Sequence, residues 1–270
     1  MRPGAALLSA ARHGLLGALA LAVPLLVTSC DSGSPPDPTP SDSPPPTGGE
    51  QVDAARDRLA ALAAAAEDRH LVASYRLTTE GRAERTVTLT AAADGTWRVD
   101  IPGGALGGTA DVAMAQTHDG VFQCALTSTQ RPEPPTCVRV AAPDQQPASR
   151  VDPRVQHLFT DWLGVLTDRQ APLSVSPART LPGARGTCFS VDSTSASLSA
   201  PLDVGIYCYD QDGTLTAARL ALGTLLLVGT PAAAPPTITL PGPVTGGEAL
   251  GMTAPPTPTA GLSPSTSTGN

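Results

Sequence analysis

Alternation of hydrophobic and polar residues marks much of the chain as β-structure. Every second residue is apolar in the segments 86–90 and 97–101, and Asp94-Gly95 lies between them. A period of two on both sides of an Asp-Gly pair is the strongest local signal of a β-hairpin. The pattern recurs around Asp119-Gly120, between 112–118 and 121–126, and around Asp212-Gly213, between 204–209 and 214–222. These three hairpins predict an antiparallel sheet built by meandering.

Apolar spacing of three and four residues predicts a helix at the start of the folded region. The positions on this stripe hold Val52, Ala55, Leu59, Leu62 and Ala66, while charged residues fill the other faces. Because the stripe is rich in alanine, we expect the helix to pack closely on a flat partner such as a sheet.

A second helix is predicted between the hairpins, with Asp152 as its cap and Pro153 in its first turn. Its apolar face would consist of Val155, Leu158, Phe159, Trp162, Leu163 and Leu166. We expect this helix to cover one face of the sheet. Phe159 and Trp162 are therefore candidates for lining a ligand pocket, with packing in the core as the alternative role.

Two shorter segments leave their structure open. Gly103-Gly104 and Gly107-Gly108 surround Leu106, and they predict either a mobile lip over a cavity or a plain connector. The segment 225–228 is apolar but too short to span a membrane, and it predicts a buried edge strand or a bulged strand beside its flanking glycines.

The N-terminus has the pattern of an export signal. Arg2 and Arg12 precede an apolar run from 15 to 26, which is shorter than the roughly 20 residues of a spanning helix. The run ends in Val27-Thr28-Ser29-Cys30, which resembles a bacterial lipobox, where the cysteine is lipidated and becomes the first residue of the mature protein. The alternative is an ordinary secretory signal followed by a chance cysteine.

Composition divides the chain into four parts. Residues 1–29 are the expected lipoprotein signal, and 30–50 are the lipidated Cys30 with a proline-rich tether that cannot bury a core. In extended polyproline form the tether reaches up to roughly 60 Å. Residues 51–241 are expected to form a single α+β domain, and 242–270 a disordered low-complexity tail.

The charge of the chain argues against nucleic acid as a partner. All 17 basic residues are arginine, and the formal net charge is −7. Loss of Arg2 and Arg12 with the signal leaves 15 basic residues against 24 acidic ones, so the mature chain carries −9. This charge also opposes electrostatic attachment to anionic lipid. The absence of lysine is typical of a GC-rich genome and, with the lipobox, suggests an actinobacterial source.

Four cysteines remain after the signal is removed, namely Cys124, Cys137, Cys188 and Cys208. An even number in an exported chain favours disulfides, with three possible connectivities. Pairing by neighbourhood predicts Cys124 with Cys137 and Cys188 with Cys208, each joining two strands that are close in sequence. Free or metal-binding thiols are the alternative, but the spacings lack the close C-x-x-C pairs of zinc sites.

The order of elements resembles that of the LolA-like lipoproteins, the mycobacterial LppX and LprG group among them. The segment 59–74 is similar to their first helix and opening strand, and 204–222, with its Tyr-Asp-x-Asp-Gly-x-Leu turn, is similar to a late hairpin. The resemblance implies an α+β fold in which a strongly curved half-barrel sheet, with helices on its concave side, encloses an apolar cavity for acyl chains.

The sequence contains no recognisable catalytic motif. Its four histidines are isolated, and it lacks H-E-x-x-H, G-x-S-x-G and a phosphate-cradling glycine loop. The segment 210–213 has some likeness to a calcium loop but is better explained as a hairpin turn. We therefore expect no enzyme activity, no metal and no cofactor.

The expected function is that of a lipid-anchored protein on the extracytoplasmic face of the membrane, which binds or carries a lipid or another hydrophobic ligand. The alternative is an envelope sensor or scaffold protein with a filled core. The expected partners are the membrane, through the anchor, and a hydrophobic ligand. An enclosed apolar cavity of several hundred Å³ would favour the carrier, because ligand pockets measure roughly 300 to 1,000 Å³.

Overall fold

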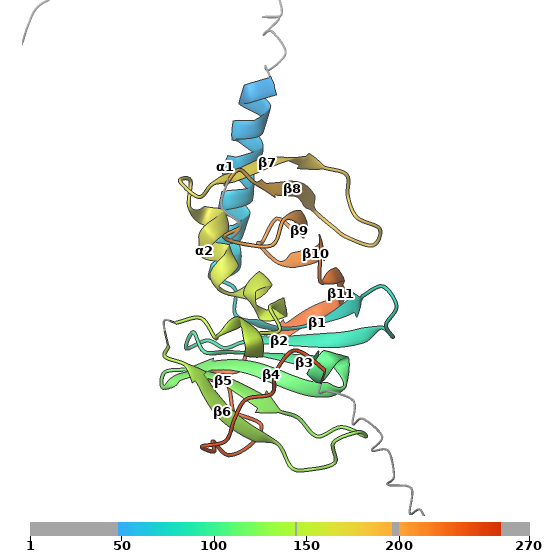
Figure 1. Ribbon diagram of the computed structural model, residues 1–270. Coiled ribbons are helices and arrows are strands. Elements are labelled where there is room, and N and C mark those ends of the chain that lie inside the picture. The colour runs from blue at the N-terminus through green and yellow to red at the C-terminus, as the bar shows by residue number, and fades with distance from the viewer. Residues whose placement is uncertain (1–47, 144, 196–199, 255–270) are drawn as a thin grey trace, which may run out of the picture. The chain divides into compact units, whose positions relative to one another are not determined.

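Eleven antiparallel strands form one open sheet in the computed structural model (Figure 1). The structure describes residues 48–143, 145–195 and 200–254, all within a unit that spans 45–270. In spatial order the strands are β6 (Thr136–Ala141), β5 (Gly120–Ala125), β4 (Ala110–Thr117), β3 (Trp97–Ala105), β2 (Arg85–Ala91), β1 (Leu71–Thr78), β11 (Gly223–Ala233), β10 (Leu215–Leu220), β9 (Gly205–Tyr209), β8 (Thr187–Ser193) and β7 (Leu173–Ala178).

The sheet consists of two meanders, β1 to β6 and β7 to β11, which join where β1 pairs with β11. All three hairpins that the Asp-Gly pairs predict are present. Gly95 and Gly213 both have φ of +83°, a backbone conformation that costs glycine little and other residues more. The segment 225–228 lies in β11 in the interior of the sheet, not at an edge. The register with β1 shifts just beyond this segment, between Val72 and Ser74, which places a bulge beside it.

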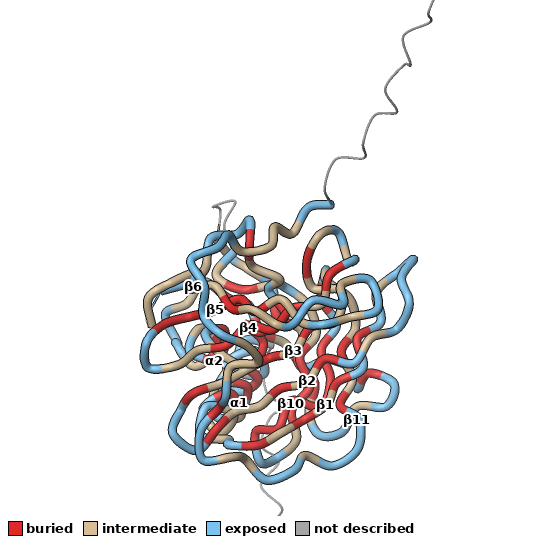
Figure 2. The backbone as a smooth tube through the Cα atoms, turned by 90° about the horizontal axis from the view of Figure 1, so that it is seen from below, coloured by how far each residue is buried: buried red, intermediate tan, exposed pale blue. Residues whose placement is uncertain are grey.

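Two helices, α1 (Gly48–Glu67) and α2 (Asp161–Thr167), cover one face of the sheet (Figure 1). Leu59 and Ala63 of α1 and Leu163 of α2 join the same core as Tyr75 and Tyr209 of the sheet. Figure 2 shows the buried positions gathered along the strands and the exposed ones in the connections. The predicted α+β class with an antiparallel sheet and helices on one face is therefore confirmed. Within the described ranges, no helix is long and apolar enough to cross a membrane.

The central helix is not continuous, which corrects the prediction of one helix from Asp152. Two short 3-10 turns, Ser149–Val151 and Val155–Phe159, precede α2. Arg154 has φ of +66°, and Thr160 has φ of −132° and ψ of −115°, so the backbone leaves the helical region twice. Asp152 does not cap a helix, because its carboxylate accepts hydrogen bonds from Gln156 and from the Arg154 amide.

Both predicted disulfides are present, on the sheet face opposite the helices. Cys124 and Cys137 are directly opposed on β5 and β6, and Cys188 and Cys208 are directly opposed on β8 and β9. Each bond lies in its own small cluster of buried residues, separate from the core beneath the helices.

Residues 242–254 belong to the folded unit, which corrects the predicted start of the tail. The Thr245 amide donates to Cys137 O, and the Leu250 amide donates to Gln123 Oε1. Amides of the 3-10 turn Leu106–Gly108 donate to Gly251 O and Met252 O, so this glycine-rich loop is a hydrogen-bonded connector. The composition of 242–254 is typical of a tail. Composition does not reveal that the segment forms hydrogen bonds with the folded unit, where an unpaired strand edge is a place for another segment to bind. Residues 255–270 and Cys30 lie outside the described residues.

Candidate functional site

A pocket of about 440 Å³ opens beside the segment that leads into α2. One part of its wall is apolar, formed by Trp97 of β3, Val121 of β5, Phe159 of the 3-10 turn before α2, and Leu163 of α2. The remaining wall is polar and includes Glu67, Gln116, Gln145, Gln146, Gln156, His157, Thr160 and Asp161. Because residues from α1, the sheet and the 3-10 turn meet here, the pocket depends on the helices being seated on the sheet.

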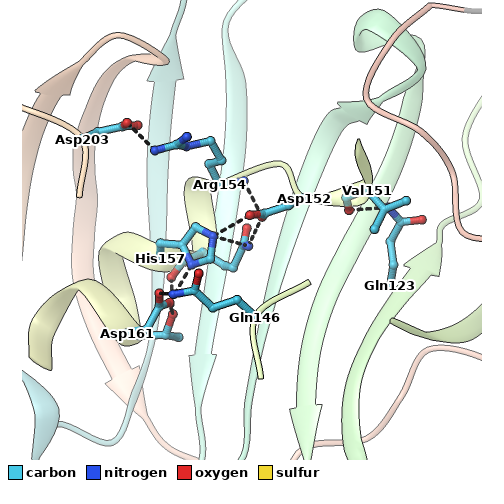
Figure 3. A network of polar contacts seen from close by, with 10 residues as sticks. Gln123, Gln146, Val151, Asp152, Arg154, His157, Asp161 and Asp203 are labelled. Carbon is cyan, nitrogen blue, oxygen red and sulfur yellow. Dashed lines mark hydrogen bonds and ion pairs between the residues drawn. The ribbon is translucent and has the colours of Figure 1, made fainter. Parts of the chain in front are cut away.

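His157 is held between two carboxylates at the edge of this pocket (Figure 3). Its Nε2 lies 2.7 Å from Asp152 Oδ2, and its Nδ1 lies 2.6 Å from Asp161 Oδ1. A neutral imidazole has one donor, so two carboxylate partners favour the doubly protonated ring. Burial lowers the pKa of His157, but hydrogen bonds to Asp152 and Asp161 outweigh it and raise the pKa to about 9.

The two carboxylates are fixed as firmly as the ring between them. Burial raises the pKa of Asp152 and of Asp161, but hydrogen bonds from His157 and its positive charge lower both below their usual value. Gln156 Nε2 donates to Asp152 Oδ1, and Gln146 Nε2 donates to Asp161 Oδ2. At neutral pH the imidazolium has no free lone pair, so it does not act as a general base.

Gln156 carries a buried acceptor behind the polar wall. The side chain is 1% exposed, and its Oε1 is buried without a hydrogen-bond partner among the described residues. Glu67, the last residue of α1, also lines the pocket, and burial together with the charge of Asp68 raises its pKa. An unmatched buried acceptor costs free energy, and this one is closed to solvent, so it does not itself face the open pocket.

The two aromatic residues predicted to line a pocket differ in their positions. Phe159 is half-buried, lines the pocket, and has its ring 4.9 Å from that of Tyr75. Trp162 is 3% exposed and does not line the pocket. Its ring stacks on His157 at 5.5 Å, and the Arg154 guanidinium lies 5.7 Å from its centroid. Trp162 therefore supports the imidazolium from the core, which is the alternative role stated for it.

Sequence reasoning missed the cluster of Asp152, His157 and Asp161. It treated the histidine as isolated and Asp152 as a helix cap. The available signal was the spacing of His157 and Asp161, which lie four residues apart on what was expected to be one helix. The contact with Asp152 had no such signal, because it depends on the backbone reversal at Arg154.

The apolar space between the helices and the sheet is almost filled. A cavity of about 40 Å³ remains there, lined by residues that include Tyr75, Leu158, Phe159 and Tyr209. One water molecule takes up about 30 Å³ of liquid, so this cavity does not hold an acyl chain. Five large aromatic side chains lie in this core instead, namely Tyr75, Trp162, Phe189, Tyr207 and Tyr209.

Neither a protein-family model nor a curated protein matches this chain. Among the described residues, no group of three or more His, Cys, Asp and Glu side chains could hold a metal ion. The chemistry of the pocket beside α2 is therefore the basis on which a function is assigned.

Proposed function

We propose that this protein is an exported lipoprotein, anchored in the membrane through Cys30, whose sheet domain binds a small hydrophobic or amphipathic ligand without catalysis. The observation that carries the proposal is the pocket of about 440 Å³, with an apolar wall beside a polar one. Its volume lies within the range of roughly 300 to 1,000 Å³ that is usual for ligand sites. Two disulfides support an extracytoplasmic location, because such bonds persist in oxidising compartments.

We further propose that the domain is a LolA-like half-barrel in which the ligand site has moved to one side. The antiparallel sheet with helices on one face supports this assignment. An acyl chain beneath the central segment is not supported, because Leu158 and Trp162 pack there against a filled core. Phe159 and Leu163 instead offer an apolar surface toward the open pocket.

The polar wall indicates what kind of head group the ligand has. Among the described residues, no arginine lines this pocket, and its only cation, His157, is matched by Asp152 and Asp161. The amides of Gln116, Gln145 and Gln146 on this wall both donate and accept hydrogen bonds. These groups suit an uncharged head with hydroxyl or amide hydrogens better than an anionic one.

The two tryptophans allow the pocket to be tested directly in the fragment 45–270. Trp162→Phe leaves Trp97 as the single tryptophan, on the pocket wall, and Trp97→Phe leaves Trp162 in the core as the matched control. We expect 1-octanoylglycerol to shift the emission of Trp97 and to leave that of Trp162 unchanged. Octanoate, with the same chain and an anionic head, is expected to bind less tightly.

An unchanged Trp97 spectrum, together with no bound molecule in native mass spectrometry of the protein purified from its host, would contradict ligand binding. The alternative function, an envelope sensor or scaffold protein, is favoured by one observation, the small volume, about 40 Å³, of the cavity between the helices and the sheet. Cross-linking in intact cells that captures one reproducible protein partner, with no ligand found, would support this alternative.

A further inference from the structure

A second polar site lies away from the ligand pocket, where the β1–β2 turn faces the glycine-rich loop. Two adjoining pockets of about 250 and 280 Å³ share four residues, namely Arg82, Arg85, Gly107 and Gly108. The protein as a whole is acidic, with a net charge of −7, so two arginines on one pocket wall stand out.

Neither arginine has an acidic partner among the described residues. The Arg82 side chain is exposed and makes no hydrogen bond or ion pair there, so all five of its donors are available, while its backbone amide donates to Thr79 O. Arg85 Nη1 donates to Pro102 O and Gly103 O at 3.2 and 3.0 Å, and Nη2 donates to Thr79 Oγ1 at 3.3 Å. These partners are neutral, so they orient the guanidinium without cancelling its charge.

The nearby acids are engaged elsewhere or oppose the positive charge weakly. Glu84 forms an ion pair with Arg76 at 3.1 Å. Asp111 accepts a hydrogen bond from the Gly103 amide at 2.7 Å. Burial and then the charge of Arg82 lower the pKa of Arg85, against a smaller opposite effect of Asp111. Asp111 therefore offsets part of the positive charge, and among the described residues no carboxylate forms an ion pair with Arg82 or Arg85.

A third arginine lines the same pocket, and a carboxylate pairs with it. Arg154 lines the pocket of about 250 Å³ and is held by Asp203 at 2.6 Å. Asp152 is the one carboxylate on that wall, and it already binds His157 and Gln156. Because Arg154 is paired with Asp203 and Asp152 with His157, the positive charge that an anion meets in this pocket comes from Arg82 and Arg85.

The glycine-rich loop is shaped to let a guanidinium lie against it. Gly107 and Gly108 have φ of +68° and +102°, and the Gly107 amide is fixed by Met252 O at 2.8 Å. A Cβ atom on Gly108 would lie 2.3 Å from Arg82 Nη1, so a side chain there would displace the arginine. The loop thus leaves room for the Arg82 guanidinium, which a side chain at position 108 would remove.

We propose that Arg82 and Arg85, with Arg154 at the far wall, bind a phosphate-type oxyanion against the glycine-rich loop. Planar guanidinium groups match the oxygens of phosphate in paired hydrogen bonds. The phosphate is either a free ion or the phosphodiester of a lipid head group, since both present the same oxygens.

Calorimetric titration of the full chain in neutral detergent micelles with inorganic phosphate tests this proposal. We expect measurable binding that weakens as sodium chloride is added, and a loss of affinity of about tenfold in Arg82→Ala, since one charge-assisted hydrogen bond is worth that much. Arg82 is exposed, so its removal leaves the fold intact. Arg58→Ala, which removes an exposed arginine from α1, is the matched control and is expected to bind as the wild type does.

A second titration distinguishes the two sources of phosphate. Micelles doped with phosphatidylglycerol are expected to compete with inorganic phosphate if a lipid head group is the ligand, and micelles doped with uncharged monoacylglycerol are not. Competition assigns the site to lipid, and its absence with phosphate bound assigns it to the free ion. The proposal is overturned if the wild type binds no phosphate at about 10 mM, where even weak sites fill, or if Arg82→Ala binds as tightly as the wild type.

Discussion

Asp152 Oδ2 lies 2.7 Å from His157 Nε2, and this contact joins the loop before the 3-10 turn to the turn itself. The side chains are 10% and 7% exposed, so the ion pair is buried. In a buried pair the loss of one partner is costly, because the other charge remains without compensation. The contact therefore stabilises the segment that forms one wall of the ligand pocket.

Removing the imidazolium should destabilise the domain strongly. His157→Ala leaves Asp152 and Asp161 close together without a cation, and we expect the free energy of unfolding to fall by about 3 to 5 kcal/mol. Urea denaturation measures this change. His118→Ala is the control, because His118 is 79% exposed and its contact with Asp94 is as long as 3.7 Å. This variant should change the free energy of unfolding by less than about 1 kcal/mol. Equal effects of both variants would contradict the buried pair.

Stability should also depend on pH through the same group. The pKa of His157 is raised from 6.5 to about 9 on folding, so its stabilisation is complete below 6.5 and is lost as the pH rises through about 9. The pKa values of Asp152 and Asp161 are lowered from 3.8, so their contribution is complete above 3.8 and is lost as the pH falls. We expect the melting temperature to fall between pH 6.5 and 9, and His157→Gln to flatten this fall.

The disulfides should stabilise the two meanders separately. The double variant Cys124→Ala/Cys137→Ala removes a bond between residues that are 13 positions apart in sequence. Cys188→Ala/Cys208→Ala removes one between residues that are 20 positions apart. In the chain-entropy model each bond contributes about 3 kcal/mol, slightly more for the longer loop. Thermal melts of both double variants measure the loss, and non-reducing peptide maps identify the pairs. Crossed pairs or free thiols would show that the strand neighbours differ from those described.

Gln123 should hold the C-terminal segment on the sheet. Its Nε2 donates to Val151 O and Leu250 O at 3.0 and 2.9 Å, and its Oε1 accepts from the Leu250 amide at 2.6 Å. Gln123→Leu leaves these backbone groups unmatched, at a cost of about 1 to 3 kcal/mol. Hydrogen exchange should become faster at Leu250, whereas Gln211→Leu in an exposed turn leaves it unchanged. Unchanged protection in Gln123→Leu would refute this role.

The anchor is tested at Cys30, which lies outside the described residues. Cys30→Ala removes the thiol that would be acylated, so the protein is expected to leave the membrane fraction or to remain unprocessed. Cell fractionation with immunoblotting makes the measurement. A cleaved Cys30→Ala protein that stays in the membrane would exclude lipidation as the means of attachment.

Local chemistry made much of this fold readable from the sequence. The Asp-Gly turns predict three hairpins because a two-residue turn and its flanking strands are neighbours in the chain. The disulfide pairs follow from the same locality, since Cys124 and Cys137, like Cys188 and Cys208, lie on consecutive strands. The helix before β1 was likewise evident from its spacing of apolar residues.

Tertiary structure alone decided which distant segments meet. Residues far apart in sequence meet where β1 pairs with β11, where residues 242–254 dock on the sheet, and at the site of Arg82. At the site of His157, the residues that meet lie on either side of a backbone reversal. Periodicity reports which face of an element is buried but not what covers it. The apolar spacing also continues across the backbone break at Thr160, so periodicity did not reveal this break. At that residue the side-chain hydroxyl of Thr160 donates to Gln156 O and to Asp161 Oδ1.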